Sequence, residues 1–409
     1  MHIDQKTLLK QKLDEIYSVT KQRHHEVQQL GVLSGLSGMA LFAYAYGWYT
    51  QKEEPAEFGE DLLTTCITKI NEGNEMATYC TGIAGVGWVL DHLVEHDLIE
   101  LDNDALFSGI DPFLFEHLKG HMANGHYDFL HGGTGFAFYF LKRYRNTRQS
   151  ELKDRYQQYL LHYLEQLAQL AQKEGTSLKW ESVLQQETGE RGFNLSLSHG
   201  MSSLINFLAR LHPHAPFQAK ATPLLQGAVA YMLASEHTDT TECMFPSWRK
   251  AEGSDKQAPS RVAWCYGDPG IGISLWYAGK ALNDEALQQK AQQILLHSAP
   301  RTSPKASGVK DAGVCHGAYG NAQLFSRMHR EMGLPPLATA TNYWLEQGLA
   351  MATHANGYAG YSQFRPIKEG TMGWEPALAP LEGITGIGLA IIDYLAEADL
   401  HWDECLLVG

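Results

Sequence analysis

Seven apolar segments recur along the chain, and each follows the pattern Gly-x-x-Gly or a close variant of it. The segments are apolar on nearly every face of a helix, which is typical of a helix buried on all sides. In the fourth repeat Ser203 replaces the second glycine, and serine is also suited to a helix start. This recurrence predicts seven structural repeats. Their first glycines are Gly35, Gly82, Gly132, Gly200, Gly267, Gly317 and Gly383.

Between the apolar segments lie stretches whose pattern predicts amphipathic helices. In the clearest of them, apolar residues fall at the spacing i, i+3, i+4, i+7. Seven such helices alternating with seven apolar ones predict fourteen helices in two layers, with the amphipathic helices outside. The apolar stripe of the clearest helix consists of Tyr156, Tyr159, Leu160, Tyr163, Leu164, Leu167 and Leu170.

The seven helical hairpins are expected to close on themselves. An open solenoid needs polar capping repeats at both ends, whereas the seventh repeat here is among the most apolar. No strand-rich segment and no long linker is evident in the pattern. The sequence therefore predicts an all-α fold, an α/α toroid with inner and outer rings of seven helices each, as a single domain over residues 1–409.

Composition and charge narrow the classes of function. The chain is 44% hydrophobic and 19% charged, which is typical of a folded globular protein. Its formal net charge of −14 argues against nucleic-acid binding. The sequence shows neither a secretory signal nor an apolar run of membrane-spanning length. We therefore expect a cytoplasmic protein with no direct membrane insertion, in which the six cysteines serve as core, metal-binding or reactive residues.

Chemically active residues gather directly before the first glycines. If the repeats are built alike, these positions share one end of the barrel, and the fifth and sixth repeats are neighbours. Cys265, Cys315 and His316 then predict a Zn²⁺ site, because two thiolates and one imidazole suit zinc and leave a fourth position for water or substrate. The alternative is that these cysteines are small core residues, which is what we expect of Cys80. The seven pairs before the glycines are Leu33-Ser34, Cys80-Thr81, Leu130-His131, Ser198-His199, Cys265-Tyr266, Cys315-His316 and Leu381-Glu382.

Four segments of the chain resemble the lanthionine synthetase C-like family, and the resemblance extends over almost the whole sequence. In length the chain is similar to the stand-alone cyclases of class I lanthipeptide biosynthesis. The resemblance implies an α/α toroid that carries one zinc ion, held by Cys265, Cys315 and His316, with water or a substrate thiolate as the fourth ligand. The four segments are RVAWCYGDPGIG (261–272), VCHGAYG (314–320), YDFLHGGTG (127–135) and SLSHG (196–200).

The reaction that the resemblance implies is the addition of a peptide cysteine thiol to dehydroalanine or dehydrobutyrine, which closes a thioether ring. A free thiol has a pKa of about 8.5, so the metal would hold it as the thiolate. The enolate formed by the attack needs a general acid, and the resemblance implies His199. Asp128 and Arg261 would orient His199 or stabilise the developing oxyanion, and Tyr266 completes the expected catalytic set.

Without the resemblance, these four residues have simpler interpretations. His199 would be a histidine at a helix N-terminus, Asp128 a helix cap and Arg261 part of a surface ion pair. Tyr266, like Trp264, would pack against its neighbours. His131 either shapes a substrate groove or is inert.

The resemblance also implies partners. These are a dehydrated precursor peptide, a dehydratase and an exporter, through which the enzyme would lie at the inner face of the membrane. Two polar segments, from about Gly175 to Arg191 and from Pro246 to Ser260, are expected to form loops over the mouth of the toroid and to touch the peptide.

Two other functions stay open. The chain would instead add glutathione to dehydroamino acids in proteins, as some proteins of this resemblance do, or serve as a non-catalytic scaffold of a biosynthetic complex. A prenyl-diphosphate enzyme on an α/α barrel is disfavoured, because the sequence has neither an Asp-rich magnesium motif nor a basic cluster for the diphosphate.

Overall fold

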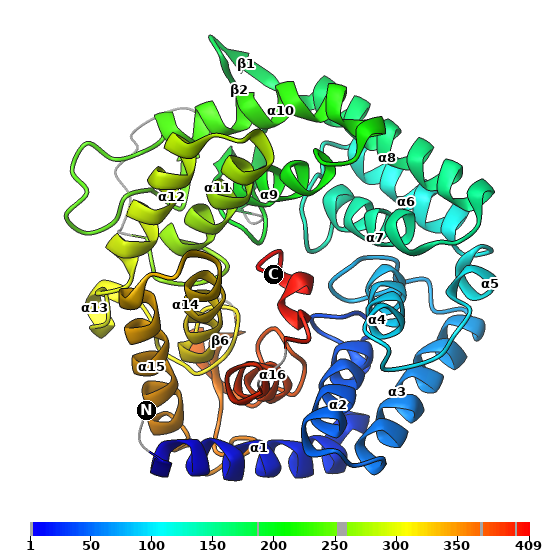
Figure 1. Ribbon diagram of the computed structural model, residues 1–409, viewed down its shortest axis with the longest axis vertical. Coiled ribbons are helices and arrows are strands. Elements are labelled where there is room, and N and C mark those ends of the chain that lie inside the picture. Colours follow the sequence, from blue (N-terminus) through cyan, green and yellow to red (C-terminus); the bar gives the residue numbers. More distant parts are fainter. Residues whose placement is uncertain (1–2, 186–187, 252–259, 369–370, 397–398) are drawn as a thin grey trace. The chain divides into compact units, whose positions relative to one another are not determined.

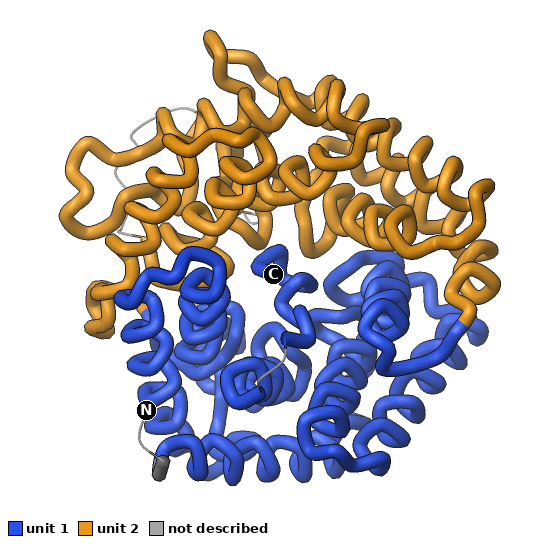
Figure 2. The backbone as a smooth tube through the Cα atoms, viewed as in Figure 1, with its two compact units in different colours: residues 1–101, 309–409 blue, residues 102–308 orange. Residues whose placement is uncertain are grey.

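The computed structural model describes residues 3–185, 188–251, 260–368, 371–396 and 399–409 (Figure 1). The chain divides into two compact units (Figure 2). Unit 1 consists of residues 1–101 and 309–409, and unit 2 of residues 102–308. Unit 1 is therefore discontinuous in sequence and unit 2 continuous, and the single domain over residues 1–409 stays a prediction.

Seven helices within the described residues are buried along most of their length, and each begins directly after the first glycine of a repeat. The sequence placed all seven correctly. They are α2 (Leu36–Thr50), α4 (Ile83–Glu95), α14 (Ala318–Met332) and α16 (Ile384–Leu395) in unit 1, and α7 (Gly133–Asn146), α9 (Met201–Leu211) and α11 (Asp268–Leu282) in unit 2.

The second glycine of the repeat allows the first helical turn to lie against the loop before it. A β-carbon on Gly320 would lie 1.9 Å from the carbonyl oxygen of Val314, and one on Gly386 would lie 1.9 Å from that of Pro380. No side chain fits at these two positions. In the fourth repeat Ser203 takes the place of the second glycine, and its Oγ donates to the Gly200 carbonyl at 2.7 Å.

Within the described residues, seven further helices alternate with the buried ones and expose part of their surface, as the sequence predicts. On α8, Tyr156, Leu160 and Tyr163 are buried, whereas Tyr159 and Leu170 at the edge of the stripe are half-buried. No described helix combines the length and the apolarity that a membrane crossing needs. The seven are α1 (Ile3–Arg23), α3 (Glu54–Asn71) and α15 (Pro335–Ala350) in unit 1, and α6 (Asp111–Ala123), α8 (Ser150–Leu170), α10 (Ala215–Ala234) and α12 (Glu285–Ser298) in unit 2.

Within each unit, buried helices pack on one another and on exposed ones. In unit 1, α2 contacts α3 and α4, α14 contacts α15, and α16 contacts α1, α2 and α14. In unit 2, α7 packs on α8, and α9 packs on α10 and α11, while α11 packs on α12. Four short helical segments complete the chain: α5 (Asn103–Phe107), α13 (Pro304–Ser307), and the 3-10 turns η1 (His24–Glu26) and η2 (Trp402–Leu406).

The described residues also contain three small antiparallel sheets, although the sequence pattern predicts none. The two segments expected to be loops contain most of the strands, and their residues 186–187 and 252–259 lie outside the described residues. The strands are three to six residues long and mostly polar, so no clear alternation marks them in the sequence. The sheets are β1 (Gln172–Glu174) with β2 (Ser177–Lys179); β3 (Ser182–Gln185) with β4 (Glu190–Asn194) and β5 (Trp248–Lys250); and β6 (Gln363–Lys368) with β7 (Thr371–Glu375).

Candidate active site

A carboxylate and an imidazole from two different repeats meet in unit 2. His199, just before α9, places its Nδ1 2.5 Å from Oδ2 of Asp128, which precedes α7. The His199 side chain is 34% exposed and that of Asp128 only 13%. The imidazole therefore reaches the surface of the unit, while the carboxylate that holds it lies beneath.

Backbone hydrogen bonds fix both members of this pair. The second carboxylate oxygen of Asp128 accepts from the backbone N–H of His131 at 2.7 Å. The backbone N–H of His199 donates to the Ser196 hydroxyl at 3.0 Å. Asp128 thus closes its local turn, as a capping residue does, and also orients His199.

The pair favours the charged form of each partner. Burial alone would lower the pKa of His199, but the Asp128 carboxylate outweighs this effect and the net pKa is raised. Burial would raise the pKa of Asp128, but His199 and the backbone N–H of His131 keep it below its ordinary value. The pair therefore favours the protonated imidazole, which is the form that delivers a proton.

Tyr266 lies beside His199, with the two ring centroids 6.2 Å apart. The amide Nδ2 of Asn194 donates to the Tyr266 hydroxyl at 3.0 Å, and burial raises the pKa of this phenol. The amide oxygen of Asn194 accepts from the backbone N–H of Ser196 at 3.0 Å. Asn194 was missed in the sequence, although it stands only two residues before the segment SLSHG.

Other residues of unit 2 that the sequence analysis singled out lie less close to the Asp128–His199 pair. Arg261 is exposed, and within the described residues no hydrogen bond or ion pair joins it to Asp128 or His199. His131 is half-buried, with its ring centroid 6.4 Å from that of His199, and burial lowers its pKa. Trp264 is fully buried, as expected of a packing residue.

A second carboxylate and imidazole pair lies in unit 1. His316 Nε2 lies 3.2 Å from Oδ2 of Asp311, a buried residue in the loop before α14. Asp311 also accepts from the backbone N–H groups of Gly313 and Phe364, each at 3.0 Å. Burial would raise the pKa of Asp311, but His316 and these donors keep it low. The sequence comparison missed Asp311, because it stands outside the pair of residues next to the glycine.

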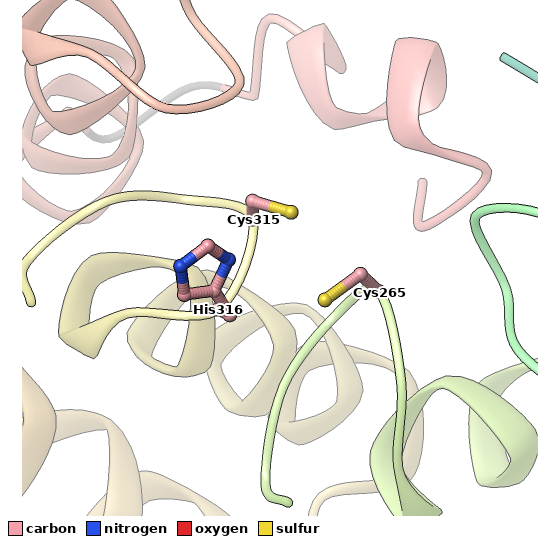
Figure 3. A group of neighbouring side chains, drawn as sticks. All are labelled: Cys265, Cys315 and His316. Carbon is pink, nitrogen blue, oxygen red and sulfur yellow. The ribbon is translucent and has the colours of Figure 1, made fainter. Parts of the chain in front are cut away.

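The cysteines divide into two groups. Cys315 stands next to His316 before α14, and Cys265 occupies the equivalent position before α11 in unit 2 (Figure 3). Cys80 is a buried free thiol, which confirms the core position expected of it, and Cys66, Cys243 and Cys405, for which the sequence leaves core and surface positions open, are buried free thiols too. Burial raises the pKa of Cys66 to about 12, which makes its thiol unreactive at neutral pH.

The donor atoms of Cys265, Cys315 and His316 suit zinc. Asp311 adds a feature common to such sites, because metal-binding histidines usually bond a carboxylate through their other ring nitrogen. The residues present therefore fit the metal that the sequence predicts.

Comparisons relate this chain to known proteins. A family model described as lanthionine synthetase C-like protein matches residues 26–407. The nisin biosynthesis protein NisC of Lactococcus lactis subsp. lactis is 25% identical over 271 residues, which is 61% of this chain and 62% of NisC. The chain thus spans less than two thirds of the length of this curated relative.

A solved structure of nisin cyclase superposes with a TM-score of 0.76 at 18% sequence identity, covering 98% of this chain and 97% of the other. This match confirms the predicted fold class, the α/α toroid. The family model covers most of the sequence and identifies the family of the chain. The protein belongs to the lanthionine synthetase C-like family.

Proposed function

We propose that this chain is a zinc-dependent lanthipeptide cyclase. Its substrate would be a dehydrated precursor peptide, whose cysteine thiols it adds to dehydroalanine or dehydrobutyrine to form thioether rings. Membership of the family and the likeness to nisin cyclase support this assignment. The observation that carries it is the Asp128–His199 pair, because thioether formation needs a proton donor and this pair holds one.

Cys265, Cys315 and His316 would hold the zinc ion, with water or the substrate thiolate as fourth ligand. Asp311 engages Nε2 of His316, so Nδ1 is the nitrogen that would bind the metal. When bound, zinc supplies the positive charge that keeps a substrate thiol ionised at neutral pH. Two cysteinate ligands would balance that charge, so the substrate sulfur would stay nucleophilic.

His199 would complete the reaction that the thiolate begins. Attack on the β-carbon forms the C–S bond and moves the π electrons of the C=C bond onto the α-carbon and its carbonyl group. His199 then delivers a proton to the α-carbon from Nε2, since its Nδ1 is engaged by Asp128. The proton lost by the thiol balances the one that the imidazole gave, so the cyclic product has the mass of the linear substrate.

Two further residues would assist. Tyr266 stands beside His199 and is held by Asn194, and its hydroxyl would stabilise the developing enolate oxygen. Arg261 is retained as a second candidate for that role on the strength of the resemblance in its segment. A dehydratase and an exporter stay predicted partners.

The proposal is tested with purified protein, zinc and a dehydrated precursor peptide. After incubation, the peptide is treated with a thiol-alkylating reagent and weighed by mass spectrometry. A cyclase protects the cysteines from alkylation and leaves the peptide mass unchanged. The variant His199→Ala should lose this protection, whereas His212→Ala, at the other end of α9, should retain it.

The same assay separates the alternative functions. If protection fails, and the peptide instead gains mass only when glutathione is added, the chain is a glutathione-adding enzyme. If the wild-type chain binds the peptide but yields neither product, the scaffold function stands and the cyclase is excluded.

A further inference from the structure

A second group of metal-ligating side chains lies in unit 1, on the last turn of α4. His92, Glu95 and His96 stand at the spacing i, i+3 and i+4, which places them on one face of a helix. One ligand atom from each lies within 4.8 Å of the other two. None of the three belongs to the residues assigned to thioether formation.

The burial of these residues sets them apart from an ordinary charged surface. The His92 side chain is completely buried, His96 is half-buried and Glu95 is exposed. The His92 ring stacks on Trp88 with centroids 4.9 Å apart and an interplanar angle of 15°. The His96 ring lies 4.4 Å from that of His92. Packing therefore holds the two imidazoles in place. Binding a cation then costs less side-chain conformational entropy than it would with mobile side chains.

The C-terminal segment, which consists of residues 399–409, orients the buried His92. His92 Nε2 lies 3.1 Å from the carbonyl oxygen of Leu400. A carbonyl only accepts, so the neutral ring carries its proton on Nε2 and its lone pair on Nδ1. A backbone carbonyl in this role is a common feature of metal-binding histidines, because it fixes the ring and raises its basicity.

Electrostatics around the group also favour a cation. The three residues stand at the C-terminal end of α4, where the helix dipole attracts positive charge. The carboxylate of Glu404, a buried residue of η2, lies 3.8 Å from Nδ1 of His92. Figure 1 shows α4 and the C-terminal segment side by side in unit 1. The His401 ring of that segment lies 5.7 Å from the His96 ring.

We propose that His92, Glu95 and His96 bind a divalent transition-metal cation of the zinc class. Two imidazoles and one carboxylate are a donor set that zinc uses. Leu400, His401 and Glu404 surround the group from the C-terminal segment. A cation bound there fastens the C-terminal segment to α4.

The test counts metal equivalents in the full-length chain. The protein is stripped with a chelator, and Zn²⁺ is titrated into wild type, Cys315→Ala, His96→Gln and the double variant. We expect two equivalents in wild type, one in each single variant and none in the double variant. His25→Gln, which alters an exposed histidine outside the group, should match wild type.

The result in the Cys315→Ala background is decisive, because it does not depend on the proposed function. If Cys315→Ala and the double variant bind the same amount of Zn²⁺, the α4 site is excluded. If wild type and Cys315→Ala bind the same amount of Zn²⁺, the thiolate site is excluded. The His96→Gln variant then decides whether the α4 site binds Zn²⁺. Circular dichroism checks that each variant is folded. Glu95→Gln, at an exposed position, removes a different ligand of the same site.

Two further measurements identify the ligands of the α4 site and the effect of the bound metal on stability. Co²⁺ in the α4 site of Cys315→Ala should show d–d absorption without the sulfur charge-transfer bands that thiolate sites give. Zn²⁺ should raise the midpoint of thermal unfolding of Cys315→Ala and leave that of the double variant unchanged, since only binding to the folded state stabilises it. Sulfur bands in the first experiment, or equal midpoint shifts in the second, would overturn the assignment.

Discussion

In unit 2 the pair Asp128–His199 and in unit 1 the pair Asp311–His316 lie beside the start of a buried helix, yet the two pairs differ in the nitrogen they engage. In unit 2, Asp128 contacts Nδ1 of His199, and the carboxylate comes from a different repeat. In unit 1, Asp311 contacts Nε2 of His316 from within the same loop. The first arrangement leaves Nε2 for chemistry and the second leaves Nδ1.

This difference shows how one repeated backbone supports two kinds of histidine. A carboxylate makes either imidazole more basic, which suits a proton donor as well as a metal ligand. Neighbouring residues then decide the role. His316 has a cysteine directly before it, whereas His199 follows Ser198 and has the phenol of Tyr266 nearby. We therefore expect His316 to act as a ligand and His199 as an acid.

The largest effect should come from removing a ligand beside His316. In Cys315→Ala and His316→Ala, we expect the zinc equivalent at the thiolate site to be lost and cyclisation to fall to the uncatalysed rate, because no charge then keeps the substrate thiol ionised. Metal analysis together with the alkylation assay measures both. Cys80→Ala is the matched control, since Cys80 stands at the equivalent position of the second repeat but is a core residue. Full activity in Cys315→Ala would remove the metal from the mechanism.

His199→Ala should separate the two histidines. Loss of a general acid slows a reaction by roughly 10²- to 10⁴-fold, so we expect that loss in the cyclisation rate while the zinc content stays at the wild-type level. Single-turnover rates and metal analysis on the same sample measure the two quantities. A loss of zinc in this variant would mean that the two pairs do not have separate roles.

Asp311→Asn should weaken zinc binding without abolishing it. Removing a carboxylate behind a metal-binding histidine typically costs about 10- to 100-fold in metal affinity. Competition with a chromophoric chelator gives the affinity directly. An unchanged affinity would show that the buried Asp311 acts only on the backbone groups of Gly313 and Phe364.

Asp128→Asn should change the pH dependence of the rate. The acid is active when protonated, so the wild-type rate falls as pH rises through the raised pKa of His199. Without the carboxylate, burial alone acts on the imidazole and lowers its pKa, so the fall should move to lower pH. Rate profiles of the two proteins test this shift, and coincident profiles would contradict it.

The same pair links stability to pH. The raised pKa of His199 contributes stability that is lost as pH rises through it, and the lowered pKa of Asp128 contributes stability that is lost as pH falls through it. The cost of Asp128→Asn in unfolding free energy should therefore be greatest between these two pKa values.

The sequence revealed the buried helices because their signal is strong and local. Each starts after a glycine on which an added β-carbon would meet backbone atoms, and most are apolar on nearly every face, as α16 is. The sheets gave no such signal, since a strand such as Gln172–Glu174 is short and exposed on every residue.

The sequence predicted only some residues of the candidate sites, because only some of them carry a local signal. Cys265, Cys315 and His316 share a position relative to the glycines, so comparing the repeats found them. Asp311 and Asn194 act through contacts with residues that stand at these positions, and only the folded loops show those contacts. The spacing of His92, Glu95 and His96 is visible in the sequence but carries weight only once His92 is seen to be buried beside Leu400.

The division of unit 1 into two stretches of sequence bears on how the protein is made. Residues 102–308 form a continuous unit and emerge from the ribosome before residues 309–409 exist. Helices α1 and α2 must wait for α16, which packs on both. Residues 102–308 are thus free to fold during translation, while residues 1–101 keep apolar surface uncovered until residues 309–409 have been made.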